Sequence, residues 1–271
     1  MTIKMIVVDM DGTFLDDKKE YNRERFKWLF TRLQEKNIQF VVASGNQYAQ
    51  LKSFFPDTYQ DMTFVAENGA FIIEKEKEVF TENIPLELIR HTLQIIEKIP
   101  GISVIVCGKK SAYVLDSSDK KFVDIVRMFY HKLTIVENFQ DIDDQILKLA
   151  LGCSESQTSS IHEQLKELLM EEITPVSSGR GSIDLIRTGT HKANGLKKLA
   201  KEEKVKPEEV MVFGDGGNDI EMLQFAKYSF AMANADCEIK NNAAYEAPSN
   251  NEEGVLEVIE QFILQGNLLE Q

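Results

Sequence analysis

The sequence predicts an α/β protein in which a parallel sheet flanked by helices is interrupted by an inserted α+β domain. In the first and last thirds of the chain, short apolar runs rich in β-branched residues alternate with helical apolar patterns. That alternation is typical of βαβ units, whose strands are parallel and buried on both faces. In the middle third the pattern changes to adjacent strands joined by short turns, which indicates a separate α+β unit.

The first part of the chain contains three predicted strands and two predicted helices. The strands are short and continuously apolar, as in MIVV and FVVA. The longer helix has apolar residues at i, i+3, i+4 and i+7, starting at Phe26. In order, we expect a strand at 5–8, a helix through 26–33, a strand at 40–43, a helix ended by Pro56 and a strand at 64–67.

The middle part starts with an amphipathic helix from about Pro85, which carries apolar residues through Ile96. After it we expect strands at 102–107 and 111–115, a helix at 122–129, a strand at 146–152, a helix at 161–168 and strands at 173–177 and 182–187.

The last part returns to the first pattern. We expect a helix at 192–203, a strand at 210–213, a helix at 218–227, a strand at 228–232 and two terminal helices. The predicted division is therefore one α/β domain formed by 1–82 and 189–271, with an inserted domain at 83–188.

Composition narrows the class of protein. The chain has 271 residues and a formal net charge of −13, which disfavours binding to nucleic acid or to anionic membranes. A small anionic substrate stays possible, because a metal ion and a lysine can reverse the charge locally. The three cysteines have no metal or disulfide spacing, and no apolar run approaches a membrane span. We expect a cytoplasmic protein; its oligomeric state stays open, a monomer being plausible.

Polar residues follow four of the predicted strands directly. Ligands of open α/β sheets bind beyond the carboxyl ends of the strands, so these clusters are expected to meet in space. They are the segments at 9–13, 44–46, 67–69 and 214–219.

The acidic residues of these clusters suggest a nucleophile and a metal site. Asp9 is the candidate nucleophile and metal ligand, and Asp11 the candidate general acid and base. Asp215 and Asp219 add the hard oxygen ligands that Mg²⁺ prefers. Taken alone, a D-x-D-G segment is also compatible with an ordinary acidic turn.

The other polar residues complete a candidate phosphate site. Ser44 and Gly45 offer a hydroxyl and backbone N–H groups, and Lys192 offers an ammonium. A carboxylate and a phosphate charge about 3 Å apart repel by roughly 5 kcal/mol at a dielectric near 20, so carboxylate attack needs such cations. Read separately, Lys192 could be a surface lysine, Ser44 a turn residue and Asn218 a helix N-cap.

Together these segments resemble the haloacid dehalogenase superfamily of phosphatases. DMDGT, Ser44-Gly45, Lys192 and GDGGND match its four motifs in order. The place of the insert, the ENGA segment and the SNNEEGV segment are similar to the Cof subfamily, whose inserted domain is a type-IIB cap. Further segments, including VVASGNQY and HKANG, resemble bacterial sugar phosphatases of that subfamily.

The resemblance implies roles for individual residues. Asp9 would attack phosphorus, and Asp11 would protonate the leaving alkoxide and then activate water. Mg²⁺ would be held by Asp9, the backbone carbonyl of Asp11 and Asp215, with Asp219 in or behind that ligand set. Phosphate would be held by the Met10 backbone, Ser44, Gly45, Lys192 and Asn218.

The recognition of the leaving group is less defined. Asn46 stands where many members of the superfamily have an arginine, which puts an anchoring arginine in doubt. Arg180, Asp184 and Tyr113 of the cap are candidates for contacting a sugar. The expected substrate is a small phosphomonoester. Alternatives are a sugar phosphomutase or phosphotransferase, a receiver-type signalling protein phosphorylated on aspartate and a non-catalytic carbohydrate-binding module.

Overall fold

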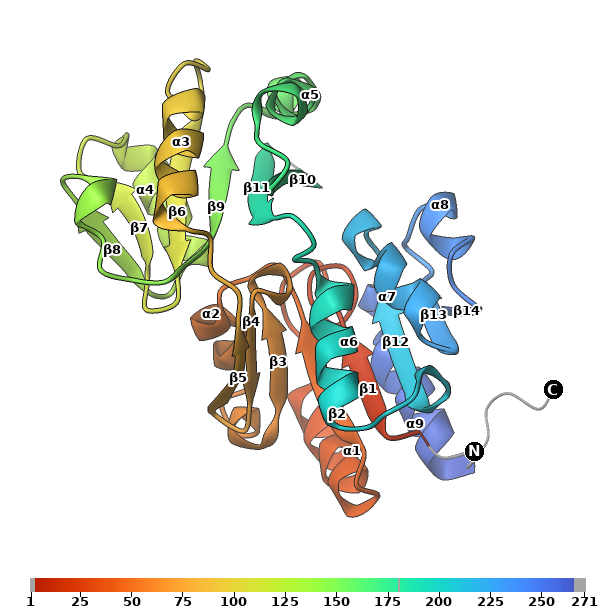
Figure 1. Cartoon of the computed structure of the whole chain (residues 1–271). Helices are drawn as coiled ribbons and strands as arrows, with labels where there is room; N and C mark the ends of the chain where they lie inside the picture. The colour runs from red at the N-terminus through yellow and green to blue at the C-terminus, as the bar shows by residue number, and fades with distance from the viewer. Residues whose placement is uncertain (1–2, 180, 266–271) are drawn as a thin grey trace.

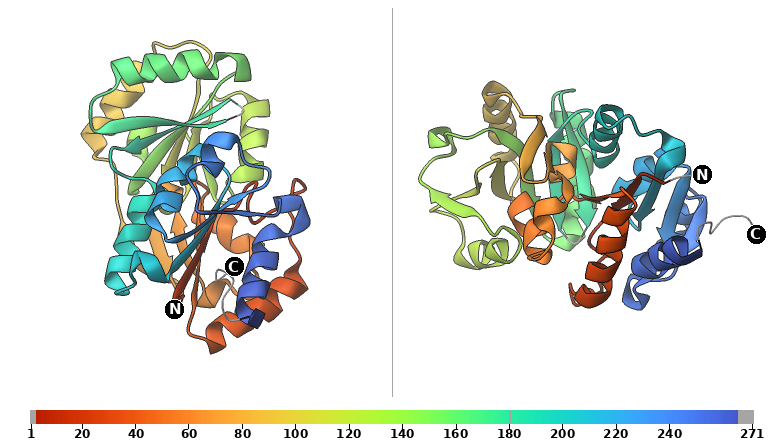
Figure 2. Two further views of the ribbon diagram at one scale, coloured as in Figure 1. Left: turned by 90° about the vertical axis from the view of Figure 1, so that its right-hand side faces the viewer. Right: turned by 90° about the horizontal axis from the view of Figure 1, so that it is seen from below.

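The computed structural model describes residues 3–179 and 181–265, and it contains two β-sheets (Figure 1). The larger sheet is formed by strands from both ends of the chain, and the smaller by strands from the middle. Figure 2 shows the smaller sheet and its helices stacked on one end of the larger one. An α/β core with an inserted α+β cap is thereby confirmed. The domain limits at 82/83 and 188/189 stay a proposal.

The larger sheet has eight strands in the order β14-β13-β12-β1-β2-β3-β4-β5. The first six of that order are parallel, and β4 and β5 are antiparallel additions at one edge. The strands are β1 (Met5–Val8), β2 (Gln39–Ala43), β3 (Thr63–Ala66), β4 (Phe71–Glu74), β5 (Lys77–Thr81), β12 (Val210–Gly214), β13 (Tyr228–Met232) and β14 (Tyr245–Ala247).

Helices cover both faces of this sheet because its central strands are apolar on both faces. In β1, Ile6 and Val8 join one apolar layer, and Met5 and Val7 join the other. The first layer is covered by α1 (Arg23–Glu35), α2 (Tyr48–Phe54) and α9 (Gly254–Gln265). The second is covered by α6 (Lys192–Glu202), α7 (Ile220–Phe225) and α8 (Cys237–Lys240).

The smaller sheet has six strands in the order β10-β11-β9-β6-β7-β8. One of its faces packs against α3 (Leu86–Ile96) and α5 (Thr158–Leu168), and the other against α4 (Lys120–Phe129). The strands are β6 (Ser103–Gly108), β7 (Ala112–Leu115), β8 (Leu133–Val136), β9 (Ile146–Gly152), β10 (Ile173–Gly179) and β11 (Ser182–Arg187).

Several elements differ from the prediction. Four strands (β4, β5, β8 and β14) were not expected, so the larger sheet is mixed rather than wholly parallel. The turn between β4 and β5 has Lys75 and Glu76 at positive φ, without the Asn or Gly that usually marks such a hairpin. Glu67 belongs to a 3₁₀ turn, η2 (Glu67–Gly69), rather than to the third strand.

No helix in the described parts of the chain is long and apolar enough to cross a membrane.

Candidate active site

The candidate residues gather at the carboxyl ends of four neighbouring strands of the larger sheet. Because β12, β1, β2 and β3 are adjacent and parallel, the segments after them leave the sheet at one edge. Asp9 follows β1, Ser44 follows β2, Glu67 follows β3 and Asp215 follows β12. The convergence expected from the sequence is therefore present.

Lys192 links two of the aspartates. It is the first residue of α6, and only 2% of its surface is exposed. Its Nζ donates to Asp9 Oδ1 at 2.5 Å and to Asp219 Oδ1 at 2.8 Å. Both carboxylates raise the pKa of Lys192 against the opposing effect of burial, so the lysine stays charged. The alternative of a solvated surface lysine is wrong.

Asp215 and Asp219 are fixed by the loop after β12. The backbone N–H groups of Asp215 and Gly216 donate to Asp219 Oδ2 at 3.1 and 3.0 Å. Thr13 Oγ1 donates to Asp215 Oδ1 at 2.7 Å. Gly12 has φ +85°, and a Cβ there would lie 2.3 Å from Asp215 Oδ2, so only glycine allows this close approach.

Three carboxylates form a group that fits a hard metal cation. One oxygen from each of Asp9, Asp215 and Asp219 lies within 4.8 Å of the others. With Lys192, the four groups carry a formal charge of −2 when all are ionised, which a divalent cation would neutralise.

Burial, together with the neighbouring carboxylates, raises the pKa values of two of these acids. Burial raises the pKa of Asp9 well above its ordinary value; Lys192 opposes this rise, and Asp219 and Asp215 add to it. Burial likewise raises the pKa of Asp215 to about 6, although the hydrogen bond from Thr13 lowers it. The site accordingly favours an added cation over three bare carboxylates.

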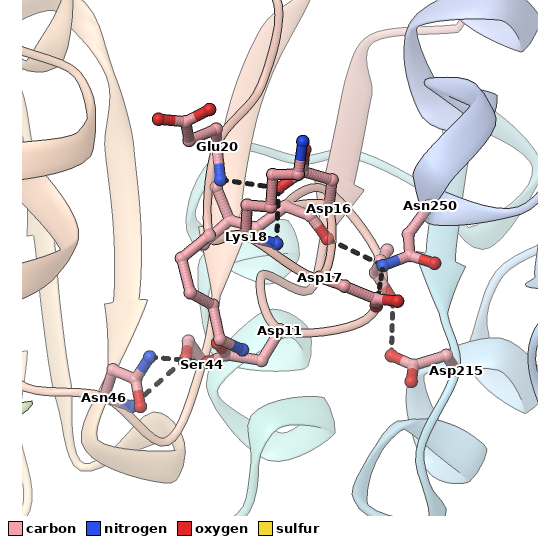
Figure 3. Close-up of polar contacts among 12 residues, drawn as sticks. Asp11, Asp16, Asp17, Lys18, Glu20, Ser44, Asn46, Asp215 and Asn250 are labelled. Atoms are coloured by element: carbon pink, nitrogen blue, oxygen red, sulfur yellow. Dashed lines mark hydrogen bonds and ion pairs between the residues drawn. The ribbon is translucent and has the colours of Figure 1, made fainter.

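Asp11 lies more exposed and is held from two sides. On one side, Lys19 Nζ donates to Asp11 Oδ1 at 2.5 Å. On the other, Asn46 Nδ2 donates to Asp11 Oδ2 at 2.8 Å (Figure 3). The backbone N–H of Asn46 donates to Ser44 Oγ at 3.1 Å. Asn46, which stands where many members of the superfamily have an arginine, thus connects the candidate acid to the candidate phosphate-binding serine.

The remaining predicted residues also border this edge of the sheet. The Met10 side chain is fully buried in the core, so it is the Met10 backbone that can face a ligand. Gly45 packs closely against Asn68, whose Oδ1 would lie 2.9 Å from a Cβ at position 45. Asn218 is not the N-cap of α7, because that helix begins after Asp219.

The cap candidates are placed differently. Asp184 Oδ2 is buried and accepts from Lys148 Nζ at 2.9 Å and from Asn68 Nδ2 at 2.8 Å. Tyr113 donates to Asp144 Oδ2 at 3.0 Å within the cap. Arg180 lies outside the described residues. Contact with a sugar by Asp184 or Tyr113 stays a prediction.

Three residues were not identified from the sequence. Thr13 stands in the DMDGT segment, whose spacing could have indicated a contact near the acids. Lys19 has no such signal, because charged residues are common in loops. Lys148 interrupts the apolar run of the strand predicted at 146–152, and this irregularity could have indicated a buried charge. Lys148 is only 3% exposed in the central part of the cap sheet.

The fold and the acidic edge of its larger sheet are those of α/β hydrolases that cleave phosphomonoesters. The model of the haloacid dehalogenase-like hydrolase family matches residues 6–259, and the chain belongs to this family. The membership predicted from the four motifs, including the Cof subfamily with its cap, is confirmed. The protein is therefore an enzyme acting on phosphoric monoester bonds.

Individual relatives agree with this assignment. An Escherichia coli protein named 5-amino-6-(5-phospho-D-ribitylamino)uracil phosphatase YbjI is 45% identical over 263 residues, which cover 97% of each chain. The crystal structure of SMU.1108c from Streptococcus mutans has a TM-score of 0.91 and 39% identity, covering 97% of this chain and 100% of that one.

A more distant structure supports the fold. It is BT4131, described as a sugar phosphatase of haloacid dehalogenase subclass IIB, with a TM-score of 0.79 and 21% identity. The similarity covers 96% of this chain and 98% of that one.

Proposed function

We propose that this phosphatase requires Mg²⁺ and hydrolyses small phosphorylated sugars or polyols through an aspartyl-phosphate intermediate on Asp9. The observation that carries the proposal is the position of Lys192, whose ammonium lies between Asp9 and Asp219 beside a third carboxylate. One ammonium alone leaves the acids in excess, and a bound divalent cation would complete a site able to receive phosphate.

In the first step, an oxygen of Asp9 attacks phosphorus while the bond from phosphorus to the leaving oxygen breaks. Lys192 holds the Asp9 carboxylate by Oδ1 and supplies positive charge to the transferred group. Asp11, in its protonated form, gives its proton to the leaving alkoxide. Mg²⁺ would neutralise charge on the phosphoryl oxygens. It would be held by Asp9, the Asp11 carbonyl and Asp215, with Asp219 close by.

In the second step, water attacks phosphorus, and the bond to Asp9 breaks to release inorganic phosphate. Asp11, now ionised, accepts the proton of that water. Asn46 and Lys19 fix the orientation of the Asp11 carboxylate for both steps. Ser44, Gly45, the Met10 backbone and Asn218 are the proposed further contacts of the phosphate group.

The proposed substrate class follows from the relatives and from the cap. The Escherichia coli relative is named for a substrate with a phosphorylated ribityl chain, and BT4131 is named a sugar phosphatase. Both names describe a phosphate ester of a polyhydroxylated carbon chain. We extend that class to this protein, with the cap covering the leaving group and limiting the access of water.

The test is a phosphate-release screen over sugar phosphates, the ribitylaminouracil phosphate and flavin mononucleotide, with Mg²⁺ and with EDTA. We expect release that depends on Mg²⁺ and is greatest for one or a few polyol phosphates. Failure on every compound, with and without metal, contradicts the proposal. Release that requires a second sugar as acceptor identifies a phosphotransferase or phosphomutase. A long-lived phosphoprotein without turnover would instead revive the receiver-type alternative.

A further inference from the structure

We propose that Lys148 of the cap is a positioning residue that couples the cap to Ser44 and Asp11 through the peptide unit between Gly45 and Asn46. This inference rests on the phosphatase function proposed above, because it gives Ser44 and Asp11 their roles.

Lys148 crosses from the cap to the core. It belongs to β9, which lies between β11 and β6 in the cap sheet, and its side chain is 4% exposed. Its Nζ donates to the backbone carbonyl of Gly45 at 2.7 Å. It also contacts Asp184 Oδ2 at 2.9 Å and lies 3.3 Å from Glu67 Oε2. Lys148 therefore joins a strand of the cap directly to the loop that carries Ser44.

The Gly45 carbonyl and the Asn46 N–H belong to one peptide unit. An ammonium that binds the carbonyl oxygen polarises this unit and strengthens its N–H as a donor. That N–H donates to Ser44 Oγ at 3.1 Å. Since Ser44 Oγ already accepts this bond, its own hydroxyl hydrogen can be directed toward a phosphate oxygen.

The same peptide unit also orients Asp11. The Asn46 side chain donates to Asp11 Oδ2 at 2.8 Å, so a rotation of the peptide would displace both the amide and the carboxylate contact (Figure 3). Hydrogen bonds through one peptide unit thus connect Lys148 in the cap to Ser44, and the side chain of Asn46, covalently attached to that unit, extends the connection to Asp11.

A second connection holds the serine loop to the same polar cluster. The backbone N–H of Asn68 donates to the carbonyl of Ser44 at 3.1 Å, and its side chain donates to Asp184. Asn68 and the preceding Glu67 have φ of 57° and 51°, a conformation that non-glycine residues rarely adopt. Such backbone persists only where the surroundings hold it, which indicates that the loop is tightly constrained here.

The charges around Lys148 are suited to holding the peptide unit between Gly45 and Asn46 in place. Asp184 and Glu67 raise the pKa of Lys148 despite its burial, so the ammonium persists. Burial raises the pKa of Glu67, Lys148 opposes that rise, and Asp184 adds to it. A lysine whose donors serve Gly45 and Asp184 is suited to holding the loop rather than to binding a leaving group.

The experiment compares Asp184→Asn with the double variant Lys148→Met/Asp184→Asn. Asp184→Asn keeps the contact between Lys148 and Gly45, and the double variant removes it without leaving a buried unpaired aspartate. Turnover of an aryl phosphate with Mg²⁺ is measured for both variants. Each is measured once with Ser44 intact and once combined with Ser44→Ala. Misplacing a reacting group commonly costs up to about 10²-fold, so we expect kcat to fall about tenfold between the two variants, with a smaller change in KM.

The double-mutant cycle distinguishes positioning from a purely structural role. When Ser44 is replaced by alanine, the loss of Lys148 is expected to cost clearly less than tenfold, because part of its effect acts through Ser44. Equal losses in both backgrounds, or no loss of kcat, overturn the proposal. Gln47→Ala is the matched control: Gln47 also joins cap and core, through the Lys132 backbone at 3.0 Å, but not through this peptide unit.

An activity-independent measurement separates this inference from the proposed function. Hydrogen exchange of the Asn46 amide is measured by NMR in the same two variants. We expect faster exchange when Lys148 is lost, because the peptide unit is then less constrained. Unchanged exchange overturns the inference even in an active enzyme. Absence of phosphatase activity in the wild type refutes the proposed function, while the exchange rates still decide whether Lys148 holds this peptide.

Discussion

Two buried lysines, one in the core and one in the cap, each lie close to two carboxylates. Lys192 contacts Asp9 and Asp219, and Lys148 contacts Asp184 and lies near Glu67. The surroundings of the two lysines differ. A third carboxylate, Asp215, joins the first cluster and leaves it with an excess of negative charge.

The Lys148 cluster has no counterpart of Asp215. In that place it contains the Gly45 carbonyl and the side-chain amide of Asn68. The Gly45 carbonyl accepts from Lys148, the Asn68 side chain donates to Asp184, and burial raises the pKa of Glu67. The comparison teaches that a buried lysine between acids does not define a function. The charge balance of its neighbours separates a site that can take a cation from one that only joins two parts of the fold.

The largest expected effect is on turnover, and it concerns the Lys192 cluster. Asp9→Asn removes the proposed nucleophile, and we expect kcat to fall by roughly 10³-fold or more, as for removal of a nucleophile in other enzymes. Phosphate release with Mg²⁺ is the measurement. Asp57→Asn, at an exposed position, is the control and should keep wild-type turnover. Substantial turnover by Asp9→Asn would contradict the assignment of the nucleophile.

The next effect is on stability, and it compares the two lysines directly. Lys148→Met leaves Asp184 buried without its cation, and we expect a loss of about 3–5 kcal/mol in the free energy of unfolding. Lys192→Met should also lose stability, but millimolar Mg²⁺ should restore part of it, since a metal can neutralise Asp9 and Asp219.

Urea denaturation of both variants, with Mg²⁺ and with EDTA, measures this difference. The exposed Lys27→Met is the control, with an expected change near zero. Equal recovery of the two variants by Mg²⁺ would show that the clusters do not differ as we infer.

A smaller effect concerns the metal itself. Mg²⁺ at about 100 times its dissociation constant should stabilise the wild type by about 2.7 kcal/mol relative to the protein in EDTA. Asp215→Asn removes one of the three clustered carboxylates and should reduce that gain. Thermal unfolding of the wild type and of Asp215→Asn, each with Mg²⁺ and with EDTA, measures this gain in stability. A gain of the same size in Asp215→Asn would exclude Asp215 as a ligand.

The smallest effect is the pH dependence of the metal-free protein. The pKa of Asp215 is raised from 3.8 to about 6, so the folded protein binds this proton more tightly than the unfolded chain does. The contribution of this proton to the free energy of unfolding is complete below about pH 4. It is lost as the pH rises through about 6, the pKa in the folded protein. In EDTA, Asp215→Asn should therefore be more stable than the wild type at pH 7, by about 1 kcal/mol after solvent screening.

At pH 5 that difference should shrink, because the wild-type Asp215 is then largely protonated in the folded state. Denaturation of the wild type and of Asp215→Asn in EDTA, at pH 7 and at pH 5, measures this difference in stability. A difference that grows as the pH falls would reverse the sign of the inferred pKa shift.

Much of the fold and most of the core site could be predicted from the sequence. Apolar runs such as MIVV and VMVF define β1 and β12 because a strand buried on both faces has no polar position. Asp9 and Asp215 follow those strands directly, so the topology of parallel strands was enough to bring them together. Lys192 was identified by its place at the start of α6 and by the family motifs.

Other features were decided only by the tertiary structure. The hairpin of β4 and β5 has no local turn signal, and its pairing with β3 depends on the edge that the parallel strands leave open. The burial of Lys148 and its bond to the Gly45 carbonyl depend on how the cap sits on the core, 103 positions away along the chain. Spacing and residue type determined where chemistry could occur. Long-range packing determined which charged groups neutralise each other, because charges separated in sequence interact only once the fold has brought them within a few ångströms.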